Sequence, residues 1–305
     1  MIDRSFLRLA SLAMLPLLLW ACHTTHNSSS SDSLVAPGTQ PTLVSKQFSF
    51  TEGPAVDKAG NVFFTDQPND KIWKYDTEGK LSLFLDKTGR SNGLYFNKEG
   101  HLIACADAKN ELWAIYPDRT VKTLMDNYEG KKMNGPNDLW IDKRDGIYFT
   151  DPYYQRDYWT RKQPELPKMH VYYLAPGLTT PVVVADSLNR PNGIVGSKDG
   201  KTLYVADIGA SKIYRYQVNA DASLSNRMLF ASQSADGITL DSKGNLYAAG
   251  NGVTVYNPKG EKILHIPVPE KWTANLCFGG KKRDQLFITA STAVYVLPML
   301  VRGIE

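Results

Sequence analysis

Residues 133–154 have the sequence MNGPNDLWIDKRDGIYFTDPYY and contain the clearest copy of a unit that recurs along the chain. The unit starts with an acid or amide residue, continues through a short apolar segment and a charged turn ending in Gly, and closes with a second apolar segment. Five further copies begin near residues 51, 91, 190, 234 and 273. Similar units spaced about 40 to 55 residues apart indicate a repeat architecture.

Further apolar segments follow within each copy, for example residues 71–75 and 81–85. Their alternating pattern, their β-branched and aromatic content, and the Gly, Asn, Asp and Pro between them predict strands. Four strands per repeat are typical of a propeller blade, so the sequence predicts an all-β, six-bladed β-propeller. The last copy has only three clear strands, and an unpaired strand at residues 42–50 precedes the first copy. We therefore expect the N-terminal strand to complete the last blade and close the ring.

The first position of the aligned copies carries the functional prediction, because every copy places a carboxylate or a carboxamide there. The members of this column are Glu52, Asn92, Asn137, Asn192, Asp236 and Asn275. The first strand of each propeller blade lines the central channel, so these side chains should form a ring at one mouth of the channel. Such oxygen ligands suit a hard divalent cation such as Ca²⁺, whereas the absence of His and Cys from the column disfavours a zinc-type site.

A purely structural role for the column is the alternative. Asn or Asp before Gly is common in turns, so Asn92, Asn192 and Asp236 could simply shape the backbone. Glu52 is a poor turn residue, however, and two acids in the ring would balance the charge of one divalent ion, which favours a metal site. A second column, at the end of the second strand, includes Asp66, Asp151 and Asp207. We assign that column to turn and blade-edge structure.

The N-terminal residues are expected to lie outside the propeller. Residues 1–21 have the basic and apolar regions of a signal peptide, and the sequence around Cys22 resembles a bacterial lipobox, which predicts lipidation of that cysteine. Conventional secretion and a retained membrane anchor are the alternatives. Residues 22–40 are rich in Ser and Thr and are expected to form a flexible tether, with the propeller at residues 41–305. The expected location is the cell envelope, on the outer membrane facing the periplasm.

The formal net charge of +4 is small, and no basic run or aromatic-basic stripe suggests a nucleic-acid partner. Membrane contact is accordingly expected only through the N-terminal lipid.

Several short motifs resemble one known family when they are taken together and in order. They are TEGP at 51–54, YEGK at 128–131, GPND at 135–138, FTDP at 149–152, PNG at 191–193 and ADGI at 235–238. In this combination they resemble the SMP-30/gluconolactonase/luciferin-regenerating family, most closely its bacterial gluconolactonase branch. The resemblance covers about residues 45 to 300.

The resemblance implies a six-bladed propeller that hydrolyses a lactone, such as gluconolactone, with one divalent metal. It implies Glu52, Asn192 and Asp236 as metal ligands, with Asn137 contacting the metal or the substrate. Ca²⁺ is the expected ion, and Mg²⁺, Mn²⁺ and Zn²⁺ are alternatives. Relatives that act on sugar lactones often have an Arg two residues before this Asn, where the present chain has Gly135.

The expected mechanism is attack on a metal-polarised lactone carbonyl by water, with Asp236 as ligand and general base. Asn92 and Asn137 are the expected substrate contacts, with Arg90 as a substitute for the arginine missing at position 135. Tyr153 is a further expected substrate contact, from a long insertion that runs to residue 167 and is expected to form a lid over the channel mouth. Packing of this aromatic loop on its own blade is the alternative.

Two other functions remain open at this stage. The chain could be a lipid-anchored binding propeller that presents a face to a protein or glycan, because propellers host many unrelated functions. It could also hydrolyse other lactones or phosphotriesters. The acid pair of Glu52 and Asp236 favours catalysis, because a scaffold has no need of two carboxylates facing one axis.

Overall fold

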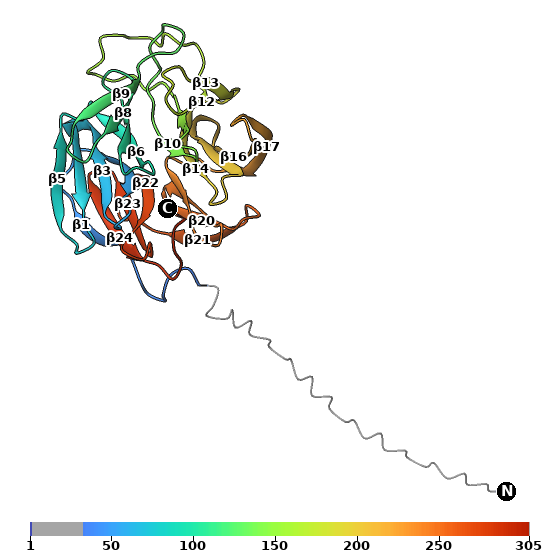
Figure 1. Cartoon of the computed structure of the whole chain (residues 1–305). Helices are drawn as coiled ribbons and strands as arrows, with labels where there is room; N and C mark the ends of the chain where they lie inside the picture. Colours follow the sequence, from blue (N-terminus) through green and yellow to red (C-terminus); the bar gives the residue numbers. More distant parts are fainter. Residues whose placement is uncertain (2–32, 305) are drawn as a thin grey trace. The chain divides into compact units, whose positions relative to one another are not determined.

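Six four-stranded antiparallel sheets make up the computed structural model, which describes residue 1 and residues 33–304. The sheets are arranged around a common axis as the blades of a propeller (Figure 1). The only helices in the described residues are the 3₁₀ turns η1 (Gln67–Asn69) and η2 (Ile208–Ala210). The predicted six-bladed all-β fold is confirmed.

Within each blade the strands follow one another in sequence from the axis outward. Blade 1 contains β2 (Thr51–Val56), β3 (Val62–Asp66), β4 (Lys71–Tyr75) and β5 (Leu81–Asp86), and blade 2 contains β6 (Ser91–Phe96), β7 (Leu102–Ala106), β8 (Glu111–Ile115) and β9 (Val121–Met125). Blade 3 contains β10 (Leu139–Ile141), β11 (Ile147–Thr150), β12 (Val171–Leu174) and β13 (Val182–Ala185), and blade 4 contains β14 (Pro191–Gly196), β15 (Thr202–Asp207), β16 (Lys212–Val218) and β17 (Leu224–Ala231). Blade 5 contains β18 (Ile238–Leu240), β19 (Leu246–Gly250), β20 (Gly252–Tyr256) and β21 (Lys262–Ile266).

The last blade is closed by the N-terminal strand, as predicted. Strands β22 (Thr273–Gly279), β23 (Gln285–Ala290) and β24 (Ala293–Pro298) are followed in the sheet by β1 (Thr42–Ser45), which pairs antiparallel with β24. Because both ends of the chain contribute to this sheet, the last blade has four strands like the others and the ring is closed. The compact unit begins at Leu34 rather than at residue 41, since Leu34 is buried in the core of the last blades.

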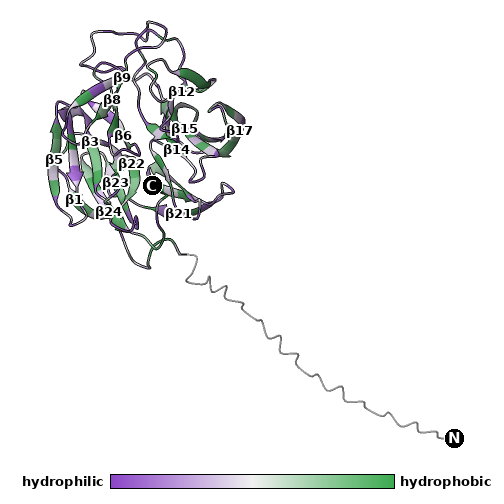
Figure 2. Ribbon diagram, viewed as in Figure 1, coloured by the Kyte–Doolittle hydropathy of each residue, from purple (hydrophilic) through white to green (hydrophobic). Residues whose placement is uncertain are grey.

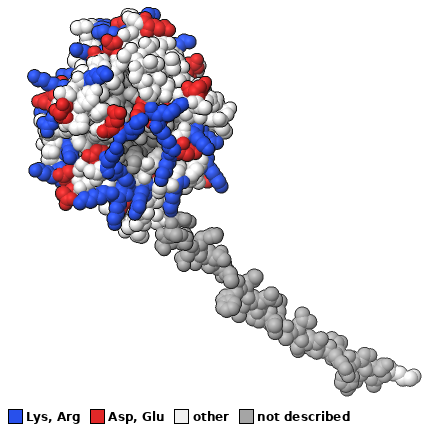
Figure 3. Space-filling model, viewed as in Figure 1, with Lys and Arg blue, Asp and Glu red and all other residues white. Residues whose placement is uncertain are grey.

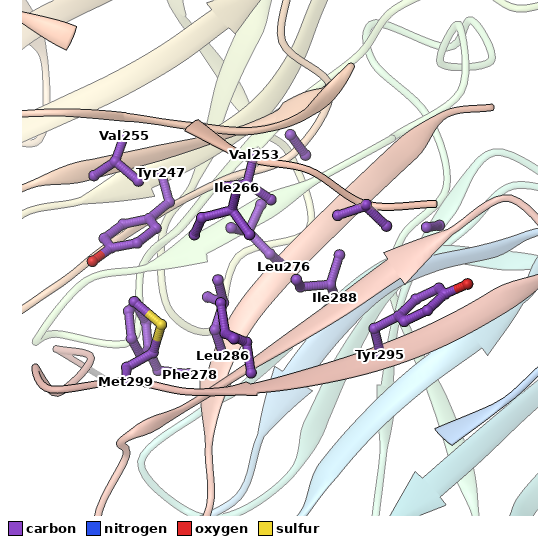
Figure 4. Close-up of a cluster of buried hydrophobic side chains, with 14 of the residues drawn as sticks. Tyr247, Val253, Val255, Ile266, Leu276, Phe278, Leu286, Ile288, Tyr295 and Met299 are labelled. Atoms are coloured by element: carbon purple, nitrogen blue, oxygen red, sulfur yellow. The ribbon is translucent and has the colours of Figure 1, made fainter. Parts of the chain in front are cut away.

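The hydrophobic core lies between neighbouring blades rather than on the axis. Figure 4 shows one such cluster, in which Tyr247 and Val253 of blade 5 face Leu276, Phe278 and other residues of blade 6. The inner strands are almost wholly buried, whereas the outermost strands, such as β5, are largely exposed or half-buried. Figure 2 shows the same division, with apolar residues along the strands and polar residues in the turns. Stability therefore resides in the blades and leaves the axis to polar residues.

The second acidic column has the structural role assigned to it. The Asp66 carboxylate accepts the backbone N–H groups of Ser49 and Phe50, on the segment that enters the first strand of its own blade. Asp151 binds two amides in the equivalent segment of blade 3, and Asp207 does so in blade 4. Each carboxylate thus fixes the backbone just ahead of a residue of the first column.

The predicted signal peptide at 1–21, the lipidation site Cys22 and most of the tether lie outside the described residues. Those assignments remain predictions. Among the described residues, no helix has the length and apolar character needed to cross a membrane.

Candidate active site

Five of the six column residues form a buried ring at one end of the channel. Glu52, Asn92, Asn137, Asn192 and Asp236 lie where the chain enters the first strand of blades 1 to 5, and each is at most 7% exposed. The backbone carbonyls of the last four accept hydrogen bonds from the preceding blade, for example Gly93 N–H to Asn137 O at 2.7 Å and Gly193 N–H to Asp236 O at 2.9 Å. Because these carbonyls are fixed by the neighbouring blade, the ring side chains are held at set positions.

The sixth member of the predicted column is displaced by one residue. In blade 6 the carbonyl that accepts from the preceding blade belongs to Ala274, from Gly237 N–H at 2.7 Å. Asn275 instead matches Asp138, because the backbone N–H of each donates to the Thr hydroxyl of the next strand, Thr289 or Thr150. By the backbone hydrogen bonds the ring has five polar members and Ala274. Asn275 lies one residue further along the strand, where its side chain still hydrogen-bonds Glu52.

Asp138 and Asn275 form a second polar layer along the axis. The Asn275 amide donates to Asp138 Oδ2 at 3.4 Å, across residues far apart in sequence. The other four blades have Gly at this position, namely Gly53, Gly93, Gly193 and Gly237. A Cβ at Gly237 would lie 2.0 Å from the Asn275 side chain, and one at Gly93 would lie 2.7 Å from Asp138 Oδ1. Gly237 therefore leaves space for the side chain of Asn275, and Gly93 leaves space for that of Asp138.

Three buried carboxylates share the axis and raise one another's proton affinity. Burial, then the negative charges of Asp236 and Asp138, raise the pKa of Glu52 well above its usual value. Burial raises the pKa of Asp138 to about 7 and that of Asp236 to about 6. No positively charged side chain in the described part of the chain forms an ion pair with these carboxylates, which leaves a bound cation to balance their negative charge.

Trp272 holds one oxygen of Asp236, and the sequence analysis missed this residue. Its indole N–H donates to Asp236 Oδ2 at 2.7 Å from the loop that precedes β22. This hydrogen bond, together with one from Asn192, lowers the pKa of Asp236 against the larger effect of burial. Trp272 and Asn192 thus orient the Asp236 carboxylate on the axis.

Tyr154, rather than Tyr153, reaches the ring. The Asn192 amide donates to the Tyr154 hydroxyl at 3.1 Å, whereas the Tyr153 hydroxyl donates to Gln155 within the insertion. The guanidinium groups of Arg190 and Arg156 lie 5.1 and 5.5 Å from the Tyr154 ring centre. These two guanidinium groups bring positive charge to Tyr154, and the charge of Arg156 also lowers the pKa of Asp236.

Arg90 does not fill the place of the missing arginine. Its guanidinium donates to the carbonyl of Pro68 at 2.6 Å and stacks on Tyr158, 4.4 Å from the ring centre. A side chain at Gly135 is also precluded, because its Cβ would lie 2.9 Å from Asp107 Oδ1 and 3.1 Å from Trp159. The insertion thus occupies the space that an arginine at position 135 would need.

Asp107 anchors the insertion to blade 2. Its carboxylate accepts hydrogen bonds from Arg156 and Tyr158, and its carbonyl accepts the Trp159 indole N–H at 2.8 Å. These bonds fix the segment that begins at Tyr153 and includes Tyr154. No sequence pattern pointed to Asp107, because its partners lie about 50 residues away.

The donor set suits a hard cation rather than a soft one. The ring offers carboxylate oxygens from Glu52 and Asp236 and carboxamide oxygens from Asn92, Asn137 and Asn192, with no nitrogen or sulfur ligand. Oxygen-only sets are typical of Ca²⁺ and Mg²⁺ sites. Within the described residues no cluster of three or more His, Cys, Asp or Glu side chains suitable for a metal is present, so any ion held here depends on the carboxamides.

A profile of the family described as "SMP-30/Gluconolactonase/LRE-like region" matches residues 50–292, which include the whole ring and all six first strands. The chain belongs to the SMP-30/gluconolactonase/LRE-like family. A gluconolactonase of Zymomonas mobilis is 28% identical over 293 residues, covering 85% of this chain and 81% of that protein.

Two solved structures of this type support the fold. A gluconolactonase of Xanthomonas campestris is 29% identical with a TM-score of 0.80, covering 86% of this chain and 89% of that one. A calcium-binding regucalcin of Agrobacterium tumefaciens has a TM-score of 0.73 over 87% of this chain and 95% of its own, at 17% identity. At that identity the regucalcin similarity establishes only the propeller fold.

Replacing Trp272 by Phe is expected to weaken cation binding about tenfold while preserving the fold. The substitution keeps an aromatic ring but removes the donor to Asp236, and a hydrogen bond to a charged group contributes about 1.5–3 kcal/mol. Titration calorimetry with Ca²⁺ would measure the dissociation constant, and Trp73→Phe serves as control because its indole N–H has no hydrogen-bond partner in the described structure. Equal cation affinities for the two variants would remove Trp272 from the site.

Proposed function

We propose that this protein opens the ring of a lactone by hydrolysis, in a reaction that depends on one divalent cation held by the axial ring. The observation that carries the proposal is the pair of buried carboxylates, Glu52 and Asp236, on an axis without a compensating ion pair. The named activity of the family relatives supports a lactone as substrate, and a sugar lactone such as gluconolactone is the proposed one.

Glu52, Asn192 and Asp236 would hold the cation, with Asn137 beside them. When bound, a divalent cation supplies Lewis-acid polarisation of a carbonyl and eases the deprotonation of water. Ca²⁺ fits the oxygen-only donor set. Mg²⁺ and Mn²⁺ have the same ligand preference.

Asp236 is the proposed general base. Trp272 orients its carboxylate, which accepts a proton from the water as the water adds to the carbonyl carbon. The carbon–oxygen bond of the ring then breaks, and the same proton passes to the departing ring oxygen, which gives a hydroxy acid. A carboxylate within hydrogen-bond reach of the water can serve as such a base.

The remaining ring residues orient the substrate. Asn92 and Asn137 can each donate and accept hydrogen bonds, as recognition of sugar hydroxyls requires. Tyr154 is already fixed by Asn192, and burial raises its pKa to about 12, so it stays protonated and can act as a donor. Tyr153 lies within the insertion and Arg90 stacks on Tyr158 of the insertion. Both residues contribute to substrate binding by fixing the position of the insertion.

The test is hydrolysis of D-glucono-1,5-lactone, followed by proton release. The protein from Ser33 onward contains the whole compact unit, which begins at Leu34. It is stripped with a chelator before Ca²⁺, Mg²⁺, Mn²⁺ or Zn²⁺ is added. Turnover that appears only with metal supports the proposal and ranks the ions. Ion binding without turnover would exclude this lactone and direct the assay to other lactones and to phosphotriesters. No ion binding at all would favour a binding propeller.

We also propose that the chain is a lipoprotein of the cell envelope, anchored through Cys22 on the outer membrane and facing the periplasm. The lipobox-like sequence that precedes this cysteine supports the proposal. Incorporation of labelled palmitate into the parent and its absence from Cys22→Ser would support the anchor. Equal labelling, or none in either protein, would contradict it.

The metal-free protein is expected to lose stability as the pH rises from about 4 to 7.5. Asp138, Asp151 and Asp236 have folded-state pKa values of about 6 to 7, above the usual 3.8, so the folded protein binds protons that the unfolded chain has already released. Added Ca²⁺ should reverse the trend, because it competes with those protons and binds more tightly at higher pH. Thermal unfolding midpoints across this range, with and without Ca²⁺, provide the measurement. A midpoint that rises with pH in the chelated protein would contradict the buried-carboxylate account.

A further inference from the structure

The end of the propeller opposite the ring carries an exposed basic residue from every blade. The ring residues precede the first strands, so the turns that follow those strands lie together at the other end of the channel. The exposed cations of these turns and of the neighbouring C-terminal segment are Lys58, Lys98, Lys143, Lys198, Lys243, Lys281, Lys282 and Arg302. We call this set the basic face. Figure 3 shows Lys and Arg side chains gathered around the centre of the viewed face, where Figure 1 marks the C-terminal end.

The acidic residues of the same turns are mostly folded back against the backbone. Asp57 accepts the N–H groups of Ala59 and Asn61, and Asp142 accepts those of Arg144 and Gly146. Asp241 makes the same kind of turn and is wholly buried. Because these three carboxylates point into their turns while the neighbouring lysines are exposed, exposed cations outnumber exposed acids here, although Glu99 and Asp199 are also exposed. Lys98 and Lys281 of this face form ion pairs, with Asp145 and Glu78 respectively.

Apolar side chains accompany the basic residues. Leu300 is 58% exposed in the C-terminal segment, and Leu178 is 59% exposed in the β12–β13 turn at the same end. Near the axis Ile304 and Trp140 line a cavity of about 220 Å³ together with Lys98, Lys143 and Lys198. Exposed leucines among lysines are typical of surfaces that rest in the interfacial region of a membrane.

The chain also enters the propeller at this end. The Leu34 carbonyl accepts the N–H of Leu300 at 2.9 Å, so the first residues of the compact unit lie beside the C-terminal segment of the basic face. Cys22 is 12 residues before Leu34 in the sequence, and such a segment spans at most about 40 Å when extended. A lipid on Cys22 would therefore keep the basic face within reach of the membrane surface.

We propose that the basic face docks on an anionic phospholipid surface, with the ring end of the channel directed away from the membrane. Electrostatic attraction between the basic face and anionic lipids would add to the anchoring that a lipid on Cys22 supplies. Lysines near an anionic surface each strengthen binding, and the effect is screened within about 10 Å at 0.1 M salt. The arrangement leaves the channel mouth open to substrate.

The test uses the non-lipidated protein from Ser33 onward and vesicles of phosphatidylcholine with or without phosphatidylglycerol. Sedimentation at low salt is expected to show binding to the anionic vesicles only, and binding should disappear near 0.5 M salt. Lys143→Ala with Lys198→Ala is expected to lower the partition coefficient about 25-fold, since each lysine contributes about fivefold. Both lysines lie far from the ring, so lactone hydrolysis in solution should be unchanged.

The matched control is Lys109→Ala with Lys212→Ala, which removes two exposed lysines at the ring end of the propeller. It should bind vesicles like the parent protein. The proposal is overturned if the parent shows no binding to anionic vesicles at low salt, if it binds neutral vesicles equally, or if the control pair loses as much binding as the pair on the basic face. None of these outcomes depends on lactone hydrolysis.

Discussion

Replacing Asp236 by Asn is expected to abolish cation binding and lactone hydrolysis while the propeller stays folded. Asn keeps the shape of the side chain and can still face Trp272, but it removes the charge that the cation needs and the base that accepts the proton. Loss of a general base alone lowers rates about 10²–10⁴-fold, and loss of the cation adds to this. Glu52→Gln is expected to have a similar effect through the cation alone.

The same two variants should be no less stable than the parent when metal is absent. At pH 7.5 the parent keeps buried carboxylates that raise one another's pKa, which opposes folding. For Asp236, a pKa of about 6 against the usual 3.8 corresponds to an upper bound of about 3 kcal/mol. Calorimetric titration, proton-release assays and chelated thermal unfolding together give the result. Unfolding of both variants would mean that the carboxylates serve the fold first, and full activity in either would exclude the proposed site.

Much of the fold followed from the repeated unit, because every blade must satisfy the same constraints. Each needs an apolar first strand to line the channel, a tight turn with Gly, and two or three strands that bury one face against the next blade. The displacement of Asn275 was beyond such reasoning. In blade 6 a bulge places Ala274 and Asn275 opposite the single residue Thr289, and only the hydrogen bonds show which of the two faces the ring.

The residues that tune the site were harder to predict than the ring itself. Trp272 reaches Asp236 from 36 residues away, and Asp107 binds Arg156 and Tyr158 from 49 and 51 residues away. Such contacts depend on how a loop lies over the propeller, and no periodic pattern encodes that. The sequence did contain evidence for Asp138, because four other copies have Gly at the equivalent position. An Asp in place of Gly indicates that the channel axis has space for its side chain.

Gly193→Ala is expected to destabilise the propeller by at least about 3 kcal/mol, because overpacked sites that cannot relax produce the largest losses. A Cβ at this position would lie 2.3 Å from the carbonyl oxygen of Asp236 and 2.8 Å from Cα of Gly237. Both are backbone atoms, so neither can rotate away, and the hydrogen bond from Gly193 N–H to Asp236 O would be lost as blades 4 and 5 separate. Activity should fall as well, since that bond positions Asp236.

The control for this variant is Gly200→Ala, in the turn after β14. Gly200 has φ of 76° and no atom near its Cβ position, so its substitution carries only the conformational penalty of about 1 kcal/mol. Denaturant unfolding of the two variants measures their free energies of unfolding. The comparison separates the cost of the steric clash at Gly193 from the cost of the backbone conformation at Gly200. Suppose instead that Gly193→Ala is no less stable than Gly200→Ala. Blades 4 and 5 would then be able to move apart at the axis without loss of stability, and the ring could not hold its side chains at set positions. The glycine layer is thus as necessary to the proposed site as its carboxylates.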